Sequence, residues 1–322
     1  MKYTTILGID ISKLTFDVAT KEGEHSKFDN TLEGFTIFSN TIAKDTLCVM
    51  EVTGIYHLEL ARFLYHNNIA VSVVNPLSVK RFIQMHLKRN KTDKADAAMI
   101  ALYATVNQVK PWVVNDEILE KSNDYYRVME QLISTRASFK NVLDALKAKK
   151  SAVELIQNVK LQVQNLTQEI KKIELQLIEF IKQYDSSLLT NLKSIKGIGV
   201  RTALVLIITT KGFENFESAK QLASYFGIAP TEKVSGTSVN GSRKISKMGN
   251  PLVRKKLFMC SLQASRFNKS CSQLYHRLLN KGKSKKLALI AVSNKLLKIA
   301  FAIAKSGLPY DENYKSVNTK IY

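Results

Sequence analysis

Cysteine is scarce in this chain, and acidic residues are few for its length. Three cysteines (Cys48, Cys260 and Cys271) are too few and too widely separated for a disulfide framework or a zinc site, and the five histidines add no metal-binding spacing. Only 27 Asp and Glu stand against 48 Lys and Arg, which gives a formal net charge of +21. Because such an excess repels itself, it indicates a polyanionic partner, most simply nucleic acid.

Long hydrophobic runs are also lacking. No uninterrupted apolar run approaches the length needed to span a bilayer. Asp10 stands where a signal peptide would need its apolar core. We therefore expect no membrane association and a cytoplasmic location. The 322 residues are enough to form two or three domains with a large core.

The first third of the chain has the pattern of an α/β domain. Three short strands are followed by alternating helices and strands, which predicts a mixed sheet. The short connection between the first two strands indicates a hairpin. The expected strands are residues 3–10, 14–20, 25–29, 47–51 and 70–74, and the expected helices are 31–43, 56–66 and a segment after Asn75-Pro76.

Two aspartates dominate the segment Lys91–Ala97 (KTDKADA). Asp93 and Asp96 are three residues apart, so a helix places them on one face, where their charges repel. Taken alone, they are more simply a solvated helix start, since acids are favoured in the first helical turn.

Two further acids change that interpretation. Asp10 and Glu51 end neighbouring apolar strands and converge on one edge of the sheet. Four carboxylates at one point need cations between them, and oxygen ligands suit Mg²⁺ or Mn²⁺. Two such ions about 4 Å apart can clamp a phosphoryl transfer. We interpret Lys91 and Lys94 as phosphate contacts beside this site.

Glycine and proline are both absent from Trp112 to Lys196. Apolar residues recur there at steps of three and four, which predicts a helical, coiled-coil-like seam. A preceding helix over about 124–149 packs back along it as an antiparallel pair, joined near Lys147–Ser151. A structural spacer and a dimerisation or RNA-binding arm explain this segment equally well. The seam residues are Leu155, Val159, Val163, Leu166, Ile170, Ile173, Leu177 and Phe180.

The C-terminal part carries a second group of candidates. Gly197 and Gly199 flank one apolar residue before an apolar helix, as in a helix-hairpin-helix element, whose backbone N–H groups can bind a phosphate. Many such turns only pack helices. A polar loop over 231–244 holds several serines, among them Ser235, and is either a flexible basic segment or the carrier of a nucleophile facing a phosphodiester. The surrounding cations are Arg243, Lys244, Lys247 and Arg254.

The order strand-Asp, strand-Glu, helix-Asp-x-x-Asp resembles the RuvC and ribonuclease H superfamily. Four short sequence motifs are similar to those of the DEDD transposases of the insertion-sequence one-ten family. They are Gly8–Lys13, Met50–Tyr56, Val74–Pro76 and Lys91–Ala97. The Gly-x-Gly hairpin, the Ala-Pro and Ser-Gly steps and Ile245–Asn250 (ISKMGN) extend the resemblance to nearly the whole chain.

The resemblance implies a RuvC-like DEDD domain over 1–110, a coiled-coil segment over 111–190 and a transposase domain over 191–322. It implies that Ser235 is the catalytic serine that becomes linked to DNA; Ser238, Ser242 and Ser246 are weaker candidates. Asp10, Glu51, Asp93 and Asp96 would hold Mg²⁺ or Mn²⁺. Donor and target DNA, a structured non-coding guide RNA and a homo-oligomer (dimer or tetramer) are the implied partners.

Two other functions fit the same residues. A junction-resolving endonuclease would use the acids to activate water, with Ser235 only binding phosphate. A basic architectural protein with a decayed acid site would bind DNA without regard to Mg²⁺. The tail over 281–305 is a basic amphipathic helix, more typical of a core cap than of a membrane or nucleic-acid arm.

Overall fold

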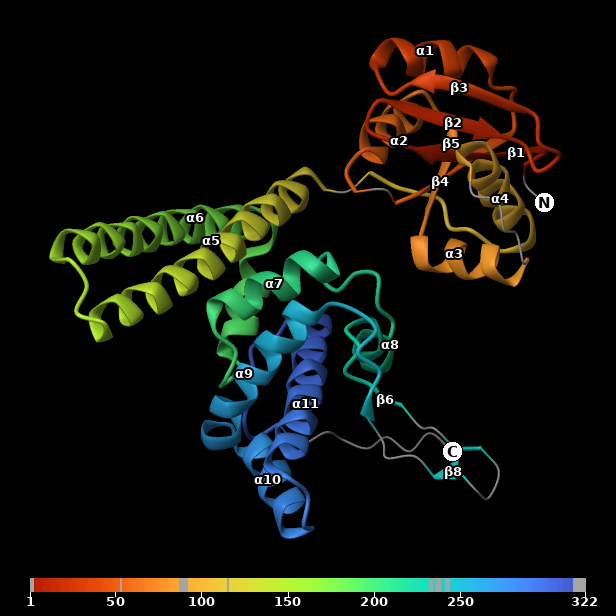
Figure 1. Ribbon diagram of the computed structural model, residues 1–322. Coiled ribbons are helices and arrows are strands. Elements are labelled where there is room, and N and C mark those ends of the chain that lie inside the picture. Colours follow the sequence, from red (N-terminus) through yellow and green to blue (C-terminus); the bar gives the residue numbers. More distant parts are fainter. Residues whose placement is uncertain are drawn as a thin grey trace, which may run out of the picture. The chain divides into compact units, whose positions relative to one another are not determined.

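The computed structural model divides the chain into two compact units, residues 1–115 and 116–322 (Figure 1). It describes residues 3–52, 54–86, 92–114, 116–231, 234–235, 239–240 and 244–314. The first unit is mixed α/β, and the second is almost entirely helical. This confirms the predicted fold class in outline.

A five-stranded mixed sheet forms the centre of the first unit, in the order β3-β2-β1-β4-β5. The central strand β1 pairs antiparallel with β2 and parallel with β4, in agreement with the predicted hairpin and mixed sheet. The strands are β1 (Thr5–Ile11), β2 (Thr15–Ala19), β3 (His25–Asp29), β4 (Thr46–Glu51) and β5 (Ala70–Val74).

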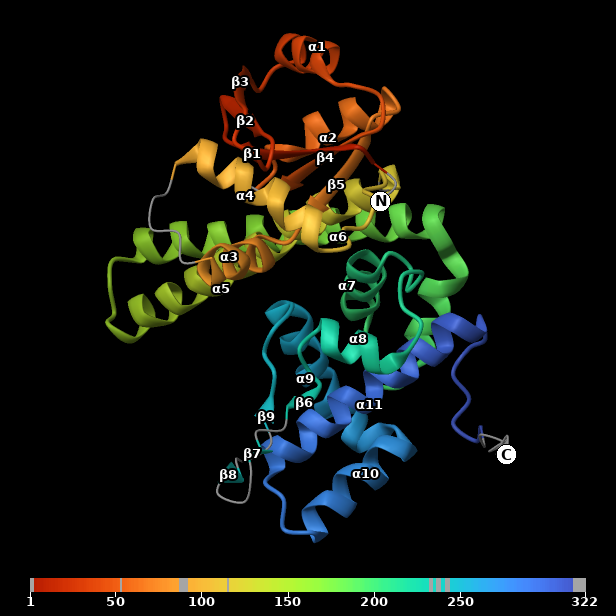
Figure 2. The same ribbon diagram turned by 90° about the vertical axis from the view of Figure 1, so that its right-hand side faces the viewer.

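Helices cover both faces of this sheet. Alternation along β1 directs Ile9 and Ile11 towards one face, where they pack with residues of α1 (Leu32–Thr41) and α2 (His57–His66). The other face carries α3 (Pro76–Met85) and α4 (Asp93–Val106). Figure 2 shows the sheet nearly edge-on, with α2 and α4 on opposite sides of it.

The second unit begins with two long helices, α5 (Glu117–Ala148) and α6 (Val153–Ser194), which pack along each other as predicted. The turn between them lies at 149–152, where the cluster of lysines placed it. Of the predicted seam, Val159, Ile170, Ile173 and Leu177 are buried, whereas Leu155 is 47% exposed and does not belong to it. The helix α6 is interrupted near its end at Asp185, whose backbone leaves the helical region.

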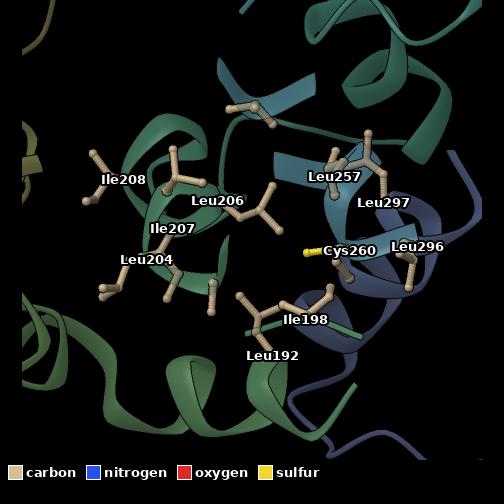
Figure 3. Packing of buried hydrophobic residues seen from close by; sticks show 14 of the residues in the cluster. Leu192, Ile198, Leu204, Leu206, Ile207, Ile208, Leu257, Cys260, Leu296 and Leu297 are labelled. Carbon is tan, nitrogen blue, oxygen red and sulfur yellow. The ribbon is translucent and has the colours of Figure 1, made fainter. Parts of the chain in front are cut away.

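The remaining helices of this unit pack into one core with the ends of α5 and α6. Figure 3 shows Leu206 of α7 facing Leu257 and Cys260 of α9, with Leu296 and Leu297 of α11 beside them. These helices are α7 (Val200–Thr210), α8 (Ala219–Tyr225), α9 (Pro251–Phe267), α10 (Lys269–Asn280) and α11 (Lys285–Ser306).

By length and composition, α11 could cross a membrane, although Lys295 and Lys298 interrupt its apolar residues, so the expectation of no uninterrupted apolar run of that length stands. A core helix of a soluble protein passes the same test. In α11, Leu296, Leu297 and Ala300 are completely buried against the other helices of the unit. This helix is therefore part of the core, as the core-cap interpretation of the tail required.

Two short strand pairs lie between α8 and α9, where the sequence predicted only a polar loop. The outer pair joins β6 (Pro230–Thr231) to β9 (Lys244–Ile245), and the inner pair joins β7 (Val234–Ser235) to β8 (Val239–Asn240). The sequence missed them because strands of two residues show no alternation. The predicted three-part domain division stays a prediction; residues 116–190 share a compact unit with the C-terminal part.

Candidate active site

The geometry of β1 decides what surrounds Asp10. In the antiparallel register Asp10 stands directly opposite Asp17, so the two side chains share one face of the sheet. In the parallel register Ile9 aligns with Met50, which brings Glu51 beside Asp10 at the end of β4. Three carboxylates from three adjacent strands therefore gather at one end of the sheet.

The helix α4 adds two more acids on this same face. Thr92 caps its N-terminus by accepting a hydrogen bond from the Ala95 N–H (3.2 Å), so Asp93 and Asp96 lie in its first turns. Gly8, which shares a face with Asp10, lets α4 approach closely, because a β-carbon there would overlap the Ala97 carbonyl oxygen and the Ala101 amide. This contact sets the distance between the helix and the strand.

The pKa of Asp10 reflects this gathering of acids. Its pKa is raised from an ordinary value near 3.8 to about 6, first by burial and then by repulsion from other carboxylates. Repulsion between charges decays with distance, so the carboxylates that raise the pKa of Asp10 are its neighbours in the cluster. The contributing acids, in decreasing order, are Asp96, Asp93, Glu51 and Asp17. The structure thus brings the four predicted acids together.

The donor set fits a divalent cation. All five groups are carboxylates, oxygen is the ligand that Mg²⁺ and Mn²⁺ prefer, and mutual repulsion is what a cation would relieve. Among the side chains that the structure describes, no three acids, histidines or cysteines lie close enough to coordinate one ion as they stand. The acids are therefore neighbours within electrostatic range, and coordination requires their side chains to draw together.

Asp17 was not singled out from the sequence, although its alternation with Phe16 and Val18 was visible. Its side chain is only 8% exposed, and its Oδ1 accepts a 2.7 Å hydrogen bond from His25 Nε2. Lys27 Nζ lies 3.7 Å from its Oδ2. Both partners come from β3, the edge strand. Pairing the predicted hairpin residue by residue would have placed Asp17 opposite Asp10. The hairpin register was thus the sequence feature from which Asp17 could have been identified.

The glycines of the predicted phosphate-binding hairpin have different surroundings. A β-carbon at Gly197, where φ is +108°, would lie 2.8 Å from Ala264 Cβ, so close packing against α9 accounts for this residue. Gly199 precedes α7, and a β-carbon there would meet nothing within 4 Å. Of these two glycines, Gly199 is the one that leaves a helix N-terminus open to a phosphate.

The basic candidates of the second unit surround the short strand pairs. Lys244 on β9 and Lys247 are exposed, and Ser246 and Lys247 anchor the chain by donating backbone hydrogen bonds to Ala229 (3.1 Å) and Gly227 (3.2 Å). Arg254 on α9 donates through Nη1 to the Phe226 carbonyl (3.0 Å).

The candidate nucleophile lies within this segment. Ser235 belongs to β7, where its backbone pairs with Val239. The acids belong to the first unit and Ser235 to the second. In the first unit, Lys94 is exposed at the start of α4. The predicted sites Lys91 and Arg243, and the weaker candidates Ser238 and Ser242, lie outside the described residues.

Comparison with protein families gives two matches. Residues 7–147 match a DEDD-type transposase model of IS110 elements, and residues 189–277 match the model described as transposase IS116/IS110/IS902 family. The first match contains all four predicted acids, and the second contains Ser235 and the hairpin glycines.

Similar proteins include relatives from Moraxella and Coxiella. The chain is 29% identical over 325 residues to the pilin gene-inverting protein of Moraxella lacunata, covering 96% of this chain and 98% of that protein. The protein of the same name from Moraxella bovis matches to the same extent. A transposase for insertion sequence element IS1111A from Coxiella burnetii is 23% identical over 94% of this chain and 90% of its own length.

Proposed function

Because this chain belongs to the IS116/IS110/IS902 family of transposases, enzymes of DNA transposition and recombination, we propose that it cuts and rejoins DNA through a serine–DNA intermediate. The observation that carries the proposal is the gathering of four acids around Asp10, whose pKa their charges help to raise to about 6. A structural role would not need like charges held together, since they oppose folding. We assign Asp10, Glu51, Asp93 and Asp96 to catalysis.

The proposed reaction conserves the phosphodiester bond. Ser235 Oγ gives up its proton and bonds to a backbone phosphorus, the bond from that phosphorus to a deoxyribose oxygen breaks, and the departing oxygen takes up a proton. Attack by a hydroxyl of the exchanged strand reverses the step and restores the serine. The protein thereby rejoins ends without an external energy source.

The four acids would hold Mg²⁺ or Mn²⁺, which when bound supplies Lewis acidity at the phosphate oxygens. Lys91, Lys94, Arg243, Lys244, Lys247, Arg254 and the backbone at Gly197 and Gly199 would bind DNA phosphates, in agreement with the net charge of +21. Gly199 is favoured over Gly197, because packing already accounts for the latter.

The finer family features are part of the same proposal. The strand order and the helix α4 on the central strand agree with a RuvC-like domain, and the turn between α6 and α7 agrees with a helix-hairpin-helix element. We further propose that a structured RNA guides the protein, that it acts in the cytoplasm as a dimer or tetramer, and that the arm of α5 and α6 contributes to one of these contacts. Two Moraxella relatives are named for inverting a pilin gene, and the proposed cutting and rejoining of DNA would also produce an inversion.

The decisive experiment tests Ser235 by trapping the intermediate. Ser235→Ala should abolish the protein–DNA adduct on denaturing gels, whereas Ser246→Ala, a serine near the same strand pairs, should retain it. Survival of cutting in Ser235→Ala would instead support the junction-resolving nuclease, in which metal-activated water cleaves. DNA binding indifferent both to Mg²⁺ and to Asp10→Asn would support an architectural protein.

A further inference from the structure

A small pocket of about 240 Å³ lies in the second unit, between β9, α9 and α11. Figure 2 shows these three elements side by side. Its walls are apolar: Ile245 comes from β9, Phe258 from α9 and Ile290 from α11. Ser293, also in its lining, is buried and already donates its hydroxyl hydrogen within the fold, to the Leu289 carbonyl (2.9 Å) or the Leu257 carbonyl (3.2 Å).

Cations surround these apolar walls. Arg254 and Lys255 line the pocket from α9, and Lys286 lines it from the first turn of α11. Arg254 is fixed by its hydrogen bond to the Phe226 carbonyl, whereas Lys255 and Lys286 are exposed. No acid is among the lining residues, so these charges are not neutralised inside the pocket.

The combination selects the chemistry of the occupant. A free anion would gain nothing from isoleucine and phenylalanine walls, and an apolar molecule would gain nothing from three cations. An unstacked nucleobase with its attached phosphate uses both, because the ring packs on an aromatic face while the phosphate meets lysine and arginine. The volume is below the range of drug-sized ligand sites and suits one ring system.

The position of the pocket indicates which nucleic acid fills it. Ile245 pairs with Pro230 in the strand pair β6–β9, and Thr231 Oγ1 donates to the Lys244 carbonyl (2.9 Å) at the same place. The chain between these strands carries Ser235. A nucleotide held here therefore lies at the base of the segment that bears the proposed nucleophile, where the proposed reaction would exchange DNA strands.

We propose that this pocket binds one unstacked nucleotide of single-stranded DNA, with its base against Phe258 and Ile290 and its phosphate at Lys255 and Lys286. The inference rests on the proposed function for the choice of DNA, and it adds a base-binding site that phosphate contacts alone do not supply. Holding a base out of the stack would keep the DNA locally unpaired during exchange.

The test measures equilibrium binding by the full chain in the Ser235→Ala background without divalent cations, so that it does not depend on catalysis. The probes are a short fluorescent oligothymidylate and an abasic oligomer with the same number of phosphates. The oligothymidylate should bind about tenfold more tightly, the effect of stacking one base on an aromatic side chain. Equal binding of the two probes would overturn the proposal.

Substitutions locate the effect. Ile290→Trp fills the pocket and should reduce binding of the oligothymidylate to the level of the abasic probe. Lys286→Glu should weaken the oligothymidylate several-fold more than Lys298→Glu, which makes the same charge change at an exposed position of the same helix. Equal effects of the two lysine changes would overturn the proposal even if Ile290→Trp fails to fold.

An oligouridylate of the same length tests whether the pocket binds DNA or RNA. Weaker or equal binding of the RNA supports a site for DNA, and clearly tighter, base-dependent binding of the RNA would overturn it. Because the adduct assay with Ser235 is independent of these measurements, the proposed reaction and the proposed pocket can fail separately.

Discussion

Gly8 of β1 and Ala97 of α4 meet backbone to backbone, with no space between them for a side chain. This contact seats the helix that carries Asp93 and Asp96 on the strand that carries Asp10. The position of the acid cluster thus depends on a residue that has no chemistry of its own.

Gly8→Ala should therefore act on structure and activity together. The added methyl group overlaps the Ala97 carbonyl oxygen and pushes α4 outward, at a cost of about 1–3 kcal/mol in the free energy of unfolding. Thermal unfolding and the adduct assay check this. Gly199→Ala, where a β-carbon meets nothing within 4 Å, is the control and should cost no more than about 1 kcal/mol. A Gly8→Ala protein of normal stability and activity would contradict the role of the contact.

Asp10→Asn should stabilise the metal-free protein while it abolishes activity. The pKa of Asp10 is higher in the folded state, about 6, than in the unfolded state, so folding takes up a proton between roughly pH 4 and 6. The stability of the metal-free wild type should consequently rise as the pH falls from 7 to 5. After allowance for solvent screening, the substitution should raise the free energy of unfolding at pH 7 by about 1 kcal/mol, which corresponds to about 4 °C in Tm.

Unfolding measured with a chelator across this pH range tests the sign. Asp45→Asn, on an exposed turn, is the control for loss of a carboxylate elsewhere in the same unit. Wild-type stability that falls as the pH drops from 7 to 5, with Asp10→Asn removing that fall, would contradict the prediction.

Asp17→Asn should weaken the sheet beside the cluster. An amide can present its NH₂ group, instead of an oxygen, towards His25 Nε2, and it loses the charge that faces Lys27. Because Asp17 is buried, we expect the free energy of unfolding to fall by about 1–3 kcal/mol, as measured by urea unfolding. Asp29→Asn, at the exposed end of β3, should change stability by less than about 0.5 kcal/mol. Equal losses in the two variants would show that the contacts of Asp17 with His25 and Lys27 do not stabilise the sheet.

Arg201→Lys should loosen the attachment of α6 to α7. Arg201 holds Glu174 through two hydrogen bonds, from Nε (2.9 Å) and Nη2 (2.5 Å), and a lysine cannot reproduce this fork. We expect a loss of about 1 kcal/mol in thermal unfolding, since the pair is partly exposed. Lys182→Ala, which breaks the exposed pair with Glu179, should leave Tm almost unchanged. A Tm for Arg201→Lys as close to wild type as that of Lys182→Ala would exclude the structural role.

Much of the first unit could be predicted from the sequence. β3 and β5 were placed to the residue, and β4 to within one residue, because turns bound these short strands and, in β4 and β5, buried apolar residues give a clear local signal. Asp17 was missed because its partner Asp10 is set by the register of a hairpin. Leu155 was wrongly assigned to the seam because periodicity alone does not show where a helical pair stops burying its side chains.

The sequence by itself determined the local elements, the basic charge and the identity of the four acids, because these depend on residue type and short spacing. Only the tertiary structure decided that Asp17 joins the acids, that Gly197 serves packing against Ala264, and that a pocket with a cationic lining forms between β9, α9 and α11. Each of these depends on backbones that are far apart in the chain approaching each other, and no local pattern records that approach.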